Sequence, residues 1–133
     1  MWITIDDLKE AFGEFDLPKT KINNVKEIDT EKINEAITWS ENWFRGNFEA
    51  IGIDTSLFTE TQTNEFKMYN LDVTRYFYSN KDMKNTDEIR ARYENAKQWM
   101  KDVKEGKIKL ITIEQPDPIE NKGFVVMTIV RAS

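Results

Sequence analysis

Acidic side chains are the residues whose type and spacing could support chemistry in this sequence. Asp6 and Glu10 stand four residues apart, and Glu31 and Glu35 repeat that spacing. On a helix, each pair would lie on one face and could share a divalent cation. The same pattern is also the ordinary beginning of a helix, where acidic groups stabilise the N-terminal end. We favour this structural role, and we predict no metal site and no catalytic residue at either pair.

A third group of oxygen-bearing side chains lies in the stretch EQPDPIENKG. Asp117, Glu120 and Asn121 precede Gly123, which gives the stretch a faint likeness to a calcium-binding loop. It lacks the alternating oxygen ligands and the closing glutamate of an EF-hand, so we predict no calcium site there.

The composition excludes most other catalytic chemistry. The 133-residue chain contains no cysteine and no histidine, which rules out disulfides, thiolate nucleophiles, Cys/His zinc sites and imidazole catalysis. A serine nucleophile needs an activating base, and the sequence offers neither a histidine nor a Gly-x-Ser-x-Gly motif. The five glycines are scattered, so no phosphate-binding loop is predicted. We therefore expect a protein that is not an enzyme and that needs no cofactor.

Charge and hydropathy narrow the range of partners. The net charge is −5, whereas nucleic-acid-binding proteins usually carry a basic patch, so we expect no sequence-specific nucleic-acid binding. No run approaches the roughly 18 apolar residues that a membrane span needs. The N-terminal stretch MWITIDDLKEAF lacks the basic region and cleavage site of a signal peptide. We expect a cytosolic protein with no membrane partner.

Helical spacing of apolar residues predicts the first two helices. The first begins at Thr4, which pairs with Asp7 as a helix cap, and continues through Phe15. Residues 16–29 should form a loop, because they contain a proline and two asparagines and show no sustained period. The second helix should begin at Asp29 or Thr30 and end near residue 51, with Gly46 as a point where it could kink.

Two further helices are predicted after a loop over residues 52–61. The third, over about 60–80, is apolar on nearly all sides, which is typical of a helix that is central or used on two faces. The fourth should begin with a capping box formed by Asn85 and Glu88. It should end before Gly106, which occupies the position of a left-handed C-terminal cap.

The period changes after the fourth helix. KIKLITI (107–113) and FVVMTIV (124–130) are rich in β-branched residues and predict two strands that are apolar on both faces. The predicted fold is thus mainly α. It consists of a four-helix bundle-like domain over residues 1–106 and a C-terminal β-strand or hairpin extension over 107–133 in the same domain.

Several large apolar side chains exceed what a simple helical bundle needs. Tryptophan and tyrosine anchors dominate protein–protein interfaces, so these residues are candidates for an interface. Alternatively, the β extension folds back and covers those on the helices. The candidates are Trp2, Trp39, Leu71, Tyr78, Ile111, Ile113, Phe124 and Val126.

The stretch RYENAKQWMKDVKEGKIKL, residues 92–110, also resembles a known family. It places Arg-Tyr, an alanine, an apolar pair and then Gly-x-Ile-x-Leu in order. The stretches ITIDDLKEAFGEFDL, IDTEKINEAITWSENWFRGNF and LDVTRYFYSN are similar to earlier helices of the same family. These are the Mu-like prophage head–tail connector proteins, also called head-completion or adaptor proteins and formerly a domain of unknown function. The resemblance covers roughly residues 3–110.

The resemblance implies a structural adaptor that docks as a ring on the portal of a tailed-phage capsid. Such a ring extends the DNA conduit and presents a platform to neck and tail proteins. It implies a homo-oligomeric ring, dodecameric when assembled and monomeric alone, located in the virion neck and in the host cytoplasm before assembly. An acidic lumen would repel DNA phosphates and let the duplex slide.

Two other functions stay open from the sequence. One is a small helical protein–protein interaction or regulatory module encoded by a prophage. The other, less favoured, is a metal hydrolase that uses carboxylates alone. Binding to the portal would distinguish the adaptor from the regulator, and metal-dependent activity lost on Asp6→Ala and Glu10→Ala would identify the enzyme.

Overall fold

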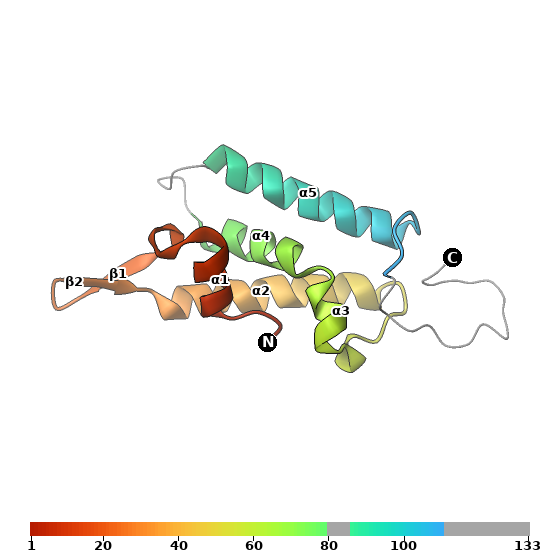
Figure 1. The fold of residues 1–133 in the computed structure, drawn as a ribbon, viewed down its shortest axis with the longest axis horizontal. Coiled ribbons are helices and arrows are strands. Elements are labelled where there is room, and N and C mark those ends of the chain that lie inside the picture. The colour runs from red at the N-terminus through yellow and green to blue at the C-terminus, as the bar shows by residue number, and fades with distance from the viewer. Residues whose placement is uncertain (80–85, 111–133) are drawn as a thin grey trace, which may run out of the picture. The chain divides into compact units, whose positions relative to one another are not determined.

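The computed structural model describes residues 1–79 and 86–110. Their elements follow one another along the chain (Figure 1): α1 (Ile5–Phe12), the 3₁₀ turn η1 (Glu14–Asp16), β1 (Lys19–Ile22), β2 (Val25–Ile28), α2 (Thr30–Glu49), η2 (Thr55–Leu57), α3 (Glu60–Asn64), α4 (Lys67–Tyr78) and α5 (Thr86–Lys104). The prediction of a mainly α-helical chain is confirmed. The described residues form five α-helices and one antiparallel hairpin, where the sequence predicted four helices.

The chain divides into two compact units. Among the described residues, the first unit comprises 1–44, 67–79 and 86–96, and the second comprises Arg45–Phe66 and residues 97–110. Helices α2 and α5 therefore contribute residues to both units.

Local capping signals fix the beginnings of α1 and α2. The Asp7 backbone N–H donates to Thr4 Oγ1 at 3.2 Å, and the Thr4 N–H donates to Asp7 Oδ2 at 2.9 Å. The predicted capping pair is thus confirmed as a capping box. The Lys32 N–H donates to Asp29 Oδ1 at 3.1 Å, which confirms a cap at the predicted beginning of α2. Helix α2 then continues through Gly46 without interruption.

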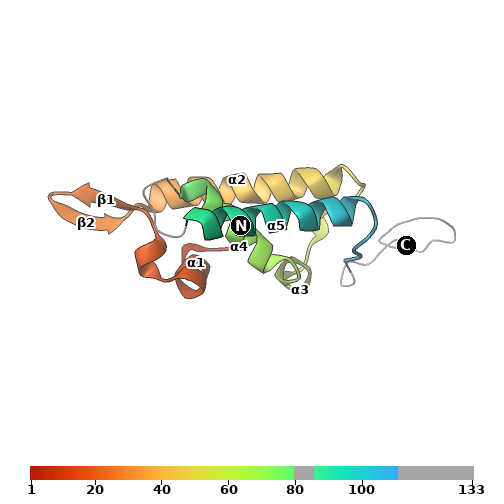
Figure 2. The ribbon, with the colours of Figure 1, turned by 90° about the horizontal axis from the view of Figure 1, so that it is seen from above.

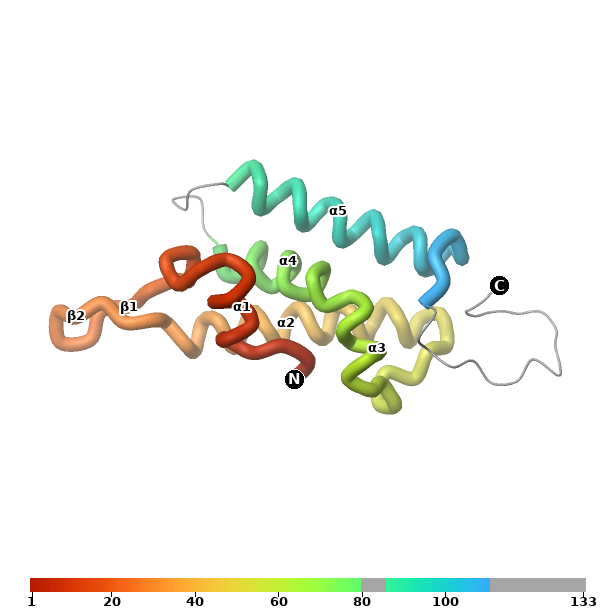
Figure 3. The backbone as a smooth tube through the Cα atoms, in the orientation of Figure 1, coloured from red at the N-terminus to blue at the C-terminus, as the bar shows by residue number. Residues whose placement is uncertain are grey.

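The loop predicted over residues 16–29 is wrong, because this segment contains a β-hairpin. Strands β1 and β2 pair antiparallel, with Lys19 opposite Ile28 and Ile22 opposite Val25. Asn23 and Asn24 form the turn with positive φ angles of 53° and 66°. A type I′ turn needs positive φ at both central residues, and asparagine accepts this conformation more readily than most residues. Figure 3 shows the chain passing from α1 through η1 into the hairpin and back into α2.

The third predicted helix is in fact two helices, α3 and α4. The Thr59 side chain accepts a hydrogen bond from the Gln62 N–H, and the Gln62 side chain accepts one from the Thr59 N–H, which begins α3 with its own capping box. The break follows at Glu65 and Phe66, and Phe66 is only 1% exposed. A single apolar stripe could not reveal this break, because Phe66 packs into a different core from the residues of α4.

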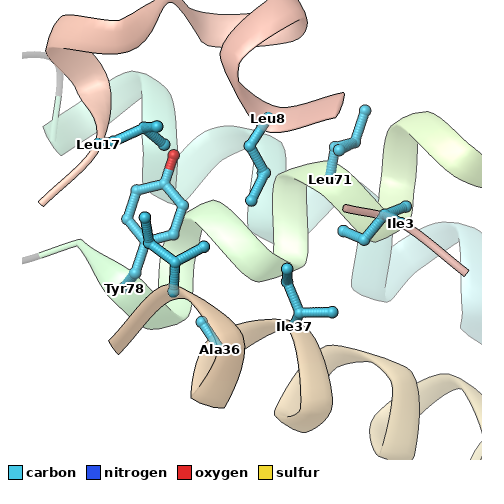
Figure 4. Close-up of a cluster of buried hydrophobic side chains, with 8 residues drawn as sticks. Ile3, Leu8, Leu17, Ala36, Ile37, Leu71 and Tyr78 are labelled. Carbon is cyan, nitrogen blue, oxygen red and sulfur yellow. The ribbon is translucent and has the colours of Figure 1, made fainter. Parts of the chain in front are cut away.

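The core of the first unit is shown in Figure 4. Its buried apolar residues come from the segment before α1, from α1, from the residue after η1, and from α2 and α4. They are Ile3, Leu8, Leu17, Ile33, Ala36, Ile37, Leu71 and Tyr78. One polar link fixes α2 against α4, since the buried Ser40 hydroxyl donates to Asn70 Oδ1 at 2.6 Å.

Aromatic rings form the core of the second unit. Phe48 is fully buried, and its ring centroid lies 5.5 Å from that of Phe58 and 5.1 Å from that of Phe66. Trp99 of α5 stacks on Phe66 with centroids 6.1 Å apart. We call Phe48, Phe58, Phe66 and Trp99 the four-ring core.

The predicted end of α5 is confirmed. Gly106 has a φ of 79°, its N–H donates to the Val103 carbonyl, and the Lys107 N–H donates to the Asp102 carbonyl at 2.8 Å. This pair of hydrogen bonds is a Schellman motif, which requires the left-handed conformation at Gly106. Residues 107–110, the beginning of the first predicted strand, form no strand. Three predicted features lie outside the described residues: the remainder of that strand, the strand at 124–130 and the helix cap Asn85.

Replacing Gly106 with valine is expected to lower the free energy of unfolding by about 1–2 kcal/mol, because a β-branched residue resists positive φ. A Cβ atom at this position would meet nothing within 4 Å, so the loss comes from backbone strain. Urea denaturation followed by circular dichroism measures it. Gly46→Ala is the matched control: Gly46 lies in α2 and also has open space around it, so alanine should stabilise by about 0.5–1 kcal/mol. Equal effects of the two substitutions would contradict the cap.

Candidate interaction surface

Large apolar side chains are exposed at several positions of the described residues. Phe15, at η1, is 100% exposed, and the hairpin residues Ile22 and Val25 are 51% and 59% exposed. Trp39 on α2 is 62% exposed, and Leu57 in the second unit is 73% exposed. Met1 and Met68 complete the set. Exposed aromatic and branched side chains of this size are what protein–protein interfaces use as anchors.

Trp39 belongs to a cluster of rings on the first unit. Its ring centroid lies 5.2 Å from that of Phe77 on α4. Phe77 in turn contacts Tyr93 on α5 edge to face, and Tyr76 stacks on Tyr93 with centroids 3.8 Å apart and ring planes within 7°. We call Trp39, Tyr76, Phe77 and Tyr93 the aromatic cluster. The cluster joins α2, α4 and α5, and its tryptophan is the residue that is 62% exposed.

The predicted interface residues have different locations. Trp39 is exposed on α2. Trp2 is partly buried, and its backbone N–H donates to Glu41 Oε1 at 2.9 Å. Ile111, Ile113, Phe124 and Val126 lie outside the described residues.

Leu71 and Tyr78 correct the sequence interpretation, because they are only 3% and 0% exposed in the core of the first unit. The sequence pattern places them on a surplus face of α4. In the structure, α1 and Leu17, the residue after η1, cover that face (Figure 4). Helix α4 therefore packs against other parts of the same chain on two of its faces.

A charged network in the first unit ties η1 to α4. Asp16 accepts hydrogen bonds from two nitrogens of Arg75: Nη2 donates to Oδ1 at 2.8 Å, and Nε donates to Oδ2 at 3.0 Å and to Oδ1 at 3.2 Å. The Tyr78 hydroxyl donates to Asp16 Oδ2 at 2.8 Å. The Arg75 and Asp16 side chains are only 6% and 10% exposed, so this bidentate pair is largely removed from water.

The network continues to α5. Arg75 Nη1 lies 3.4 Å from Glu88 Oε1, and Arg92 lies 3.3 Å from Glu88 Oε2 and 3.4 Å from Asp72 Oδ1. The Arg75 guanidinium also sits 4.3 Å from the centre of the Phe12 ring, a cation–π contact. The network thus connects η1, α1, α4 and α5 within the first unit.

The pKa shifts in the network favour a structural role. Burial, reinforced by the hydrogen bond to Asp16, raises the pKa of Tyr78, which keeps its hydroxyl a proton donor. Burial also raises the pKa of Asp72, although the charge of Arg92 opposes the shift. For Arg75, burial acts to lower the pKa, but the hydrogen bond and charge of Asp16 outweigh it and raise the pKa. Each shifted group is engaged with a partner in the network, so we assign these groups to positioning the helices.

The acidic pairs considered for chemistry stand apart from this network. Asp6 is exposed, while Asp7 pairs with Lys67 at 3.1 Å. Burial opposes the change, but hydrogen bonds from the Thr4 backbone and from Lys67 lower the pKa of Asp7. Over residues 1–79 and 86–110, no three histidine, cysteine or carboxylate groups gather closely enough to hold a metal ion. Over the same residues, no helix has the length and apolar character that crossing a membrane requires.

The chain is thus mainly helical, exposes several large apolar side chains, and has a charged network that holds η1, α1, α4 and α5 together. Residues 2–128 match the family model described as "Bacteriophage Mu, Gp36", and the chain therefore belongs to this bacteriophage Mu family. No curated protein matches the chain, and no solved structure matches it either. The prediction of a Mu-like phage protein is confirmed.

Proposed function

We propose that this protein is a structural head–tail connector, an adaptor that docks on the portal as a ring and extends the DNA conduit toward the tail. The observation that carries the proposal is the apolar surface, with Phe15, Trp39 and the hairpin pair Ile22 and Val25 exposed on one small unit. Large aromatic and branched side chains are the residues that protein–protein interfaces use as anchors, and partners would cover them in the assembled structure. Membership of a bacteriophage Mu family makes a virion component the natural partner.

In this proposal the chain binds the portal protein on one side and neck or tail proteins on the other. The ring is a homo-oligomer, so each copy offers two different faces to its neighbours. The net charge of −5 suits a conduit through which DNA slides, because an acidic lumen gives the phosphates no strong attachment. We propose no enzymatic activity, no cofactor and no membrane partner for this role.

Mixing the purified chain with the portal protein of the same phage tests the proposal. We expect a collar of fixed stoichiometry on the portal ring, visible by electron microscopy and measurable by native mass spectrometry. A chain that ignores the portal but retains a cellular protein partner would instead support a regulatory module and refute the adaptor.

Trp39→Ser is expected to weaken binding to the portal or to the neighbouring copy at least about tenfold, because truncation of an interface tryptophan commonly costs about 2 kcal/mol or more. The melting temperature should change little, since Trp39 is 62% exposed. Arg90→Ser, at an exposed position of α5, is the control for a general surface change. Unchanged collar formation by Trp39→Ser would remove the aromatic cluster from the proposed interface.

A further inference from the structure

The β-hairpin is an exposed arm of the first unit. Figures 1 and 2 both show it extending beyond the helices of that unit. Residues 21–26 are all exposed. Among residues 1–79 and 86–110 the sheet has two strands, so within this part of the chain each strand has one edge without a neighbouring strand. A two-stranded hairpin is at best marginally stable in water, and an open strand edge invites another chain. The hairpin is therefore a candidate site for binding another protein chain.

The charges of the hairpin indicate what it binds. Lys21 and Lys26 stand directly opposite each other in the strand register. Like charges at such positions repel and destabilise the hairpin. Within the described part of the chain, neither ammonium group lies within 4 Å of a carboxylate. An acidic partner would relieve this repulsion.

The hairpin tip is apolar as well as basic. Ile22 and Val25 flank the turn as a directly opposed pair and are about half exposed. Side chains alternate along a strand, so Ile22 and Val25 project from one face of the ribbon and the two lysines from the other. The lysine stems are long and the ribbon is only two strands wide, so both ammonium groups can reach past its edges. A suitable partner thus offers an apolar contact flanked by acidic groups.

The second unit of the same chain carries a surface of that kind. Leu57, at the end of η2, is 73% exposed and is one of the most exposed large apolar residues. Asp54 and Glu60 stand three residues before and after it, and both are exposed. Hydrogen bonds from the Ser56 hydroxyl and backbone lower the pKa of Asp54, which keeps its carboxylate charged. From Gly46 to Phe66 the chain contains four acidic residues and no basic one.

We infer that the hairpin tip of one copy binds the Asp54–Glu60 segment of a second copy. Ile22 and Val25 cover Leu57, while Lys21 and Lys26 lie near Asp54 and Glu60. Both surfaces, the hairpin tip and the Asp54–Glu60 segment, are exposed within a single chain. Because the two surfaces differ, the contact is head to tail, and repeating it gives either a closed ring or an open filament. The inference rests on the proposed adaptor function in one respect: it names the contact that would join neighbouring copies in the ring.

Disulfide cross-linking tests the contact, because the chain contains no cysteine of its own. Ile22→Cys and Leu57→Cys are prepared as separate full-length proteins, mixed and oxidised mildly, with and without the portal. We expect the mixed dimer to form at least about tenfold faster than with a matched control, Met68→Cys in place of Leu57→Cys. Met68 is 52% exposed, so the control thiol is also accessible.

Charge reversal tests the electrostatic part of the contact. Lys21→Glu with Lys26→Glu, introduced beside Ile22→Cys, should slow cross-linking to Leu57→Cys about tenfold. Adding Glu60→Lys to the Leu57→Cys partner should restore much of the rate. Arg90→Glu with Lys101→Glu makes the same change in net charge at exposed positions of α5 and should leave the rate unchanged.

The outcomes separate this contact from the adaptor function. Selective cross-linking of the Ile22→Cys protein to the Leu57→Cys protein, with or without the portal, supports the contact even if no collar forms. Suppose instead that wild-type protein forms a collar, but Ile22→Cys reacts with Leu57→Cys no faster than with Met68→Cys. That result overturns the contact and leaves the adaptor function standing.

Discussion

Replacing Asp16 with alanine is expected to lower the free energy of unfolding by about 3–5 kcal/mol. The substitution leaves the Arg75 guanidinium, whose side chain is 6% exposed, without its bidentate partner. It also removes the acceptor of the Tyr78 hydroxyl, which is buried in the core of the first unit. Losing a partner of a buried charge costs far more than losing an exposed ion pair, because the remaining charge cannot return to water. Urea denaturation followed by circular dichroism measures the change.

Two comparison variants separate charge from packing at this site. Tyr78→Phe removes a single hydrogen bond to a carboxylate and should cost about 1.5–3 kcal/mol. Asp16→Leu combined with Arg75→Met replaces both charges with apolar groups and should recover most of the stability lost in Asp16→Ala. A loss below about 1 kcal/mol in Asp16→Ala would mean that water reaches Arg75 and that the network does not hold η1 against α4.

The helix ends could be predicted because their signals are local. The Thr4–Asp7 pair, the cap at Asp29 and the left-handed Gly106 each depend on a few neighbouring residues. The hairpin signal was local too. The two asparagines, Asn23 and Asn24, indicated a turn. A type I′ turn joins two paired strands, and the prediction of an irregular loop did not take those strands into account.

The charged network could not be predicted because its partners are distant in sequence. Asp16 and Arg75 are 59 residues apart, and nothing near either residue indicates the other. The same applies to Leu71 and Tyr78, which are buried in a core whose other residues come from distant segments of the chain, α1, Leu17 and α2 among them. Apolar periodicity shows that a helix face needs cover, but it does not show which element provides it.

The candidate surface could be predicted in part. Trp39 falls off the apolar stripe of α2 and is exposed, as its position indicated. The sequence pattern places Phe15 on the apolar face of the first helix. The helix ends at Phe12, Gly13 takes a φ of 87°, and Phe15 then points into solvent. The glycine was the signal, because a positive φ redirects the chain and breaks the helical register.

Replacing Phe48 with alanine is expected to lower the free energy of unfolding by about 3–5 kcal/mol. Phe48 is fully buried in the four-ring core of the second unit, and its ring contacts those of Phe58, Phe66 and Trp99. Alanine removes the central ring and leaves a cavity that three rigid rings cannot close by small movements. Urea denaturation gives the overall loss. Hydrogen exchange at the amides of α3 reports whether the second unit opens by itself.

Phe48→Leu shows whether ring shape or buried volume sustains this core. Leucine keeps most of the apolar volume but loses the edge-to-face contacts, so it should cost only about 1–2 kcal/mol. If alanine costs no more than leucine, the four rings are not a packed core. If alanine raises exchange in α3 while the amides of α4 stay protected, the second unit unfolds separately. The segment from Asp54 to Glu60 then depends in part on Phe48 for its structure, because Phe58 packs it onto this ring cluster.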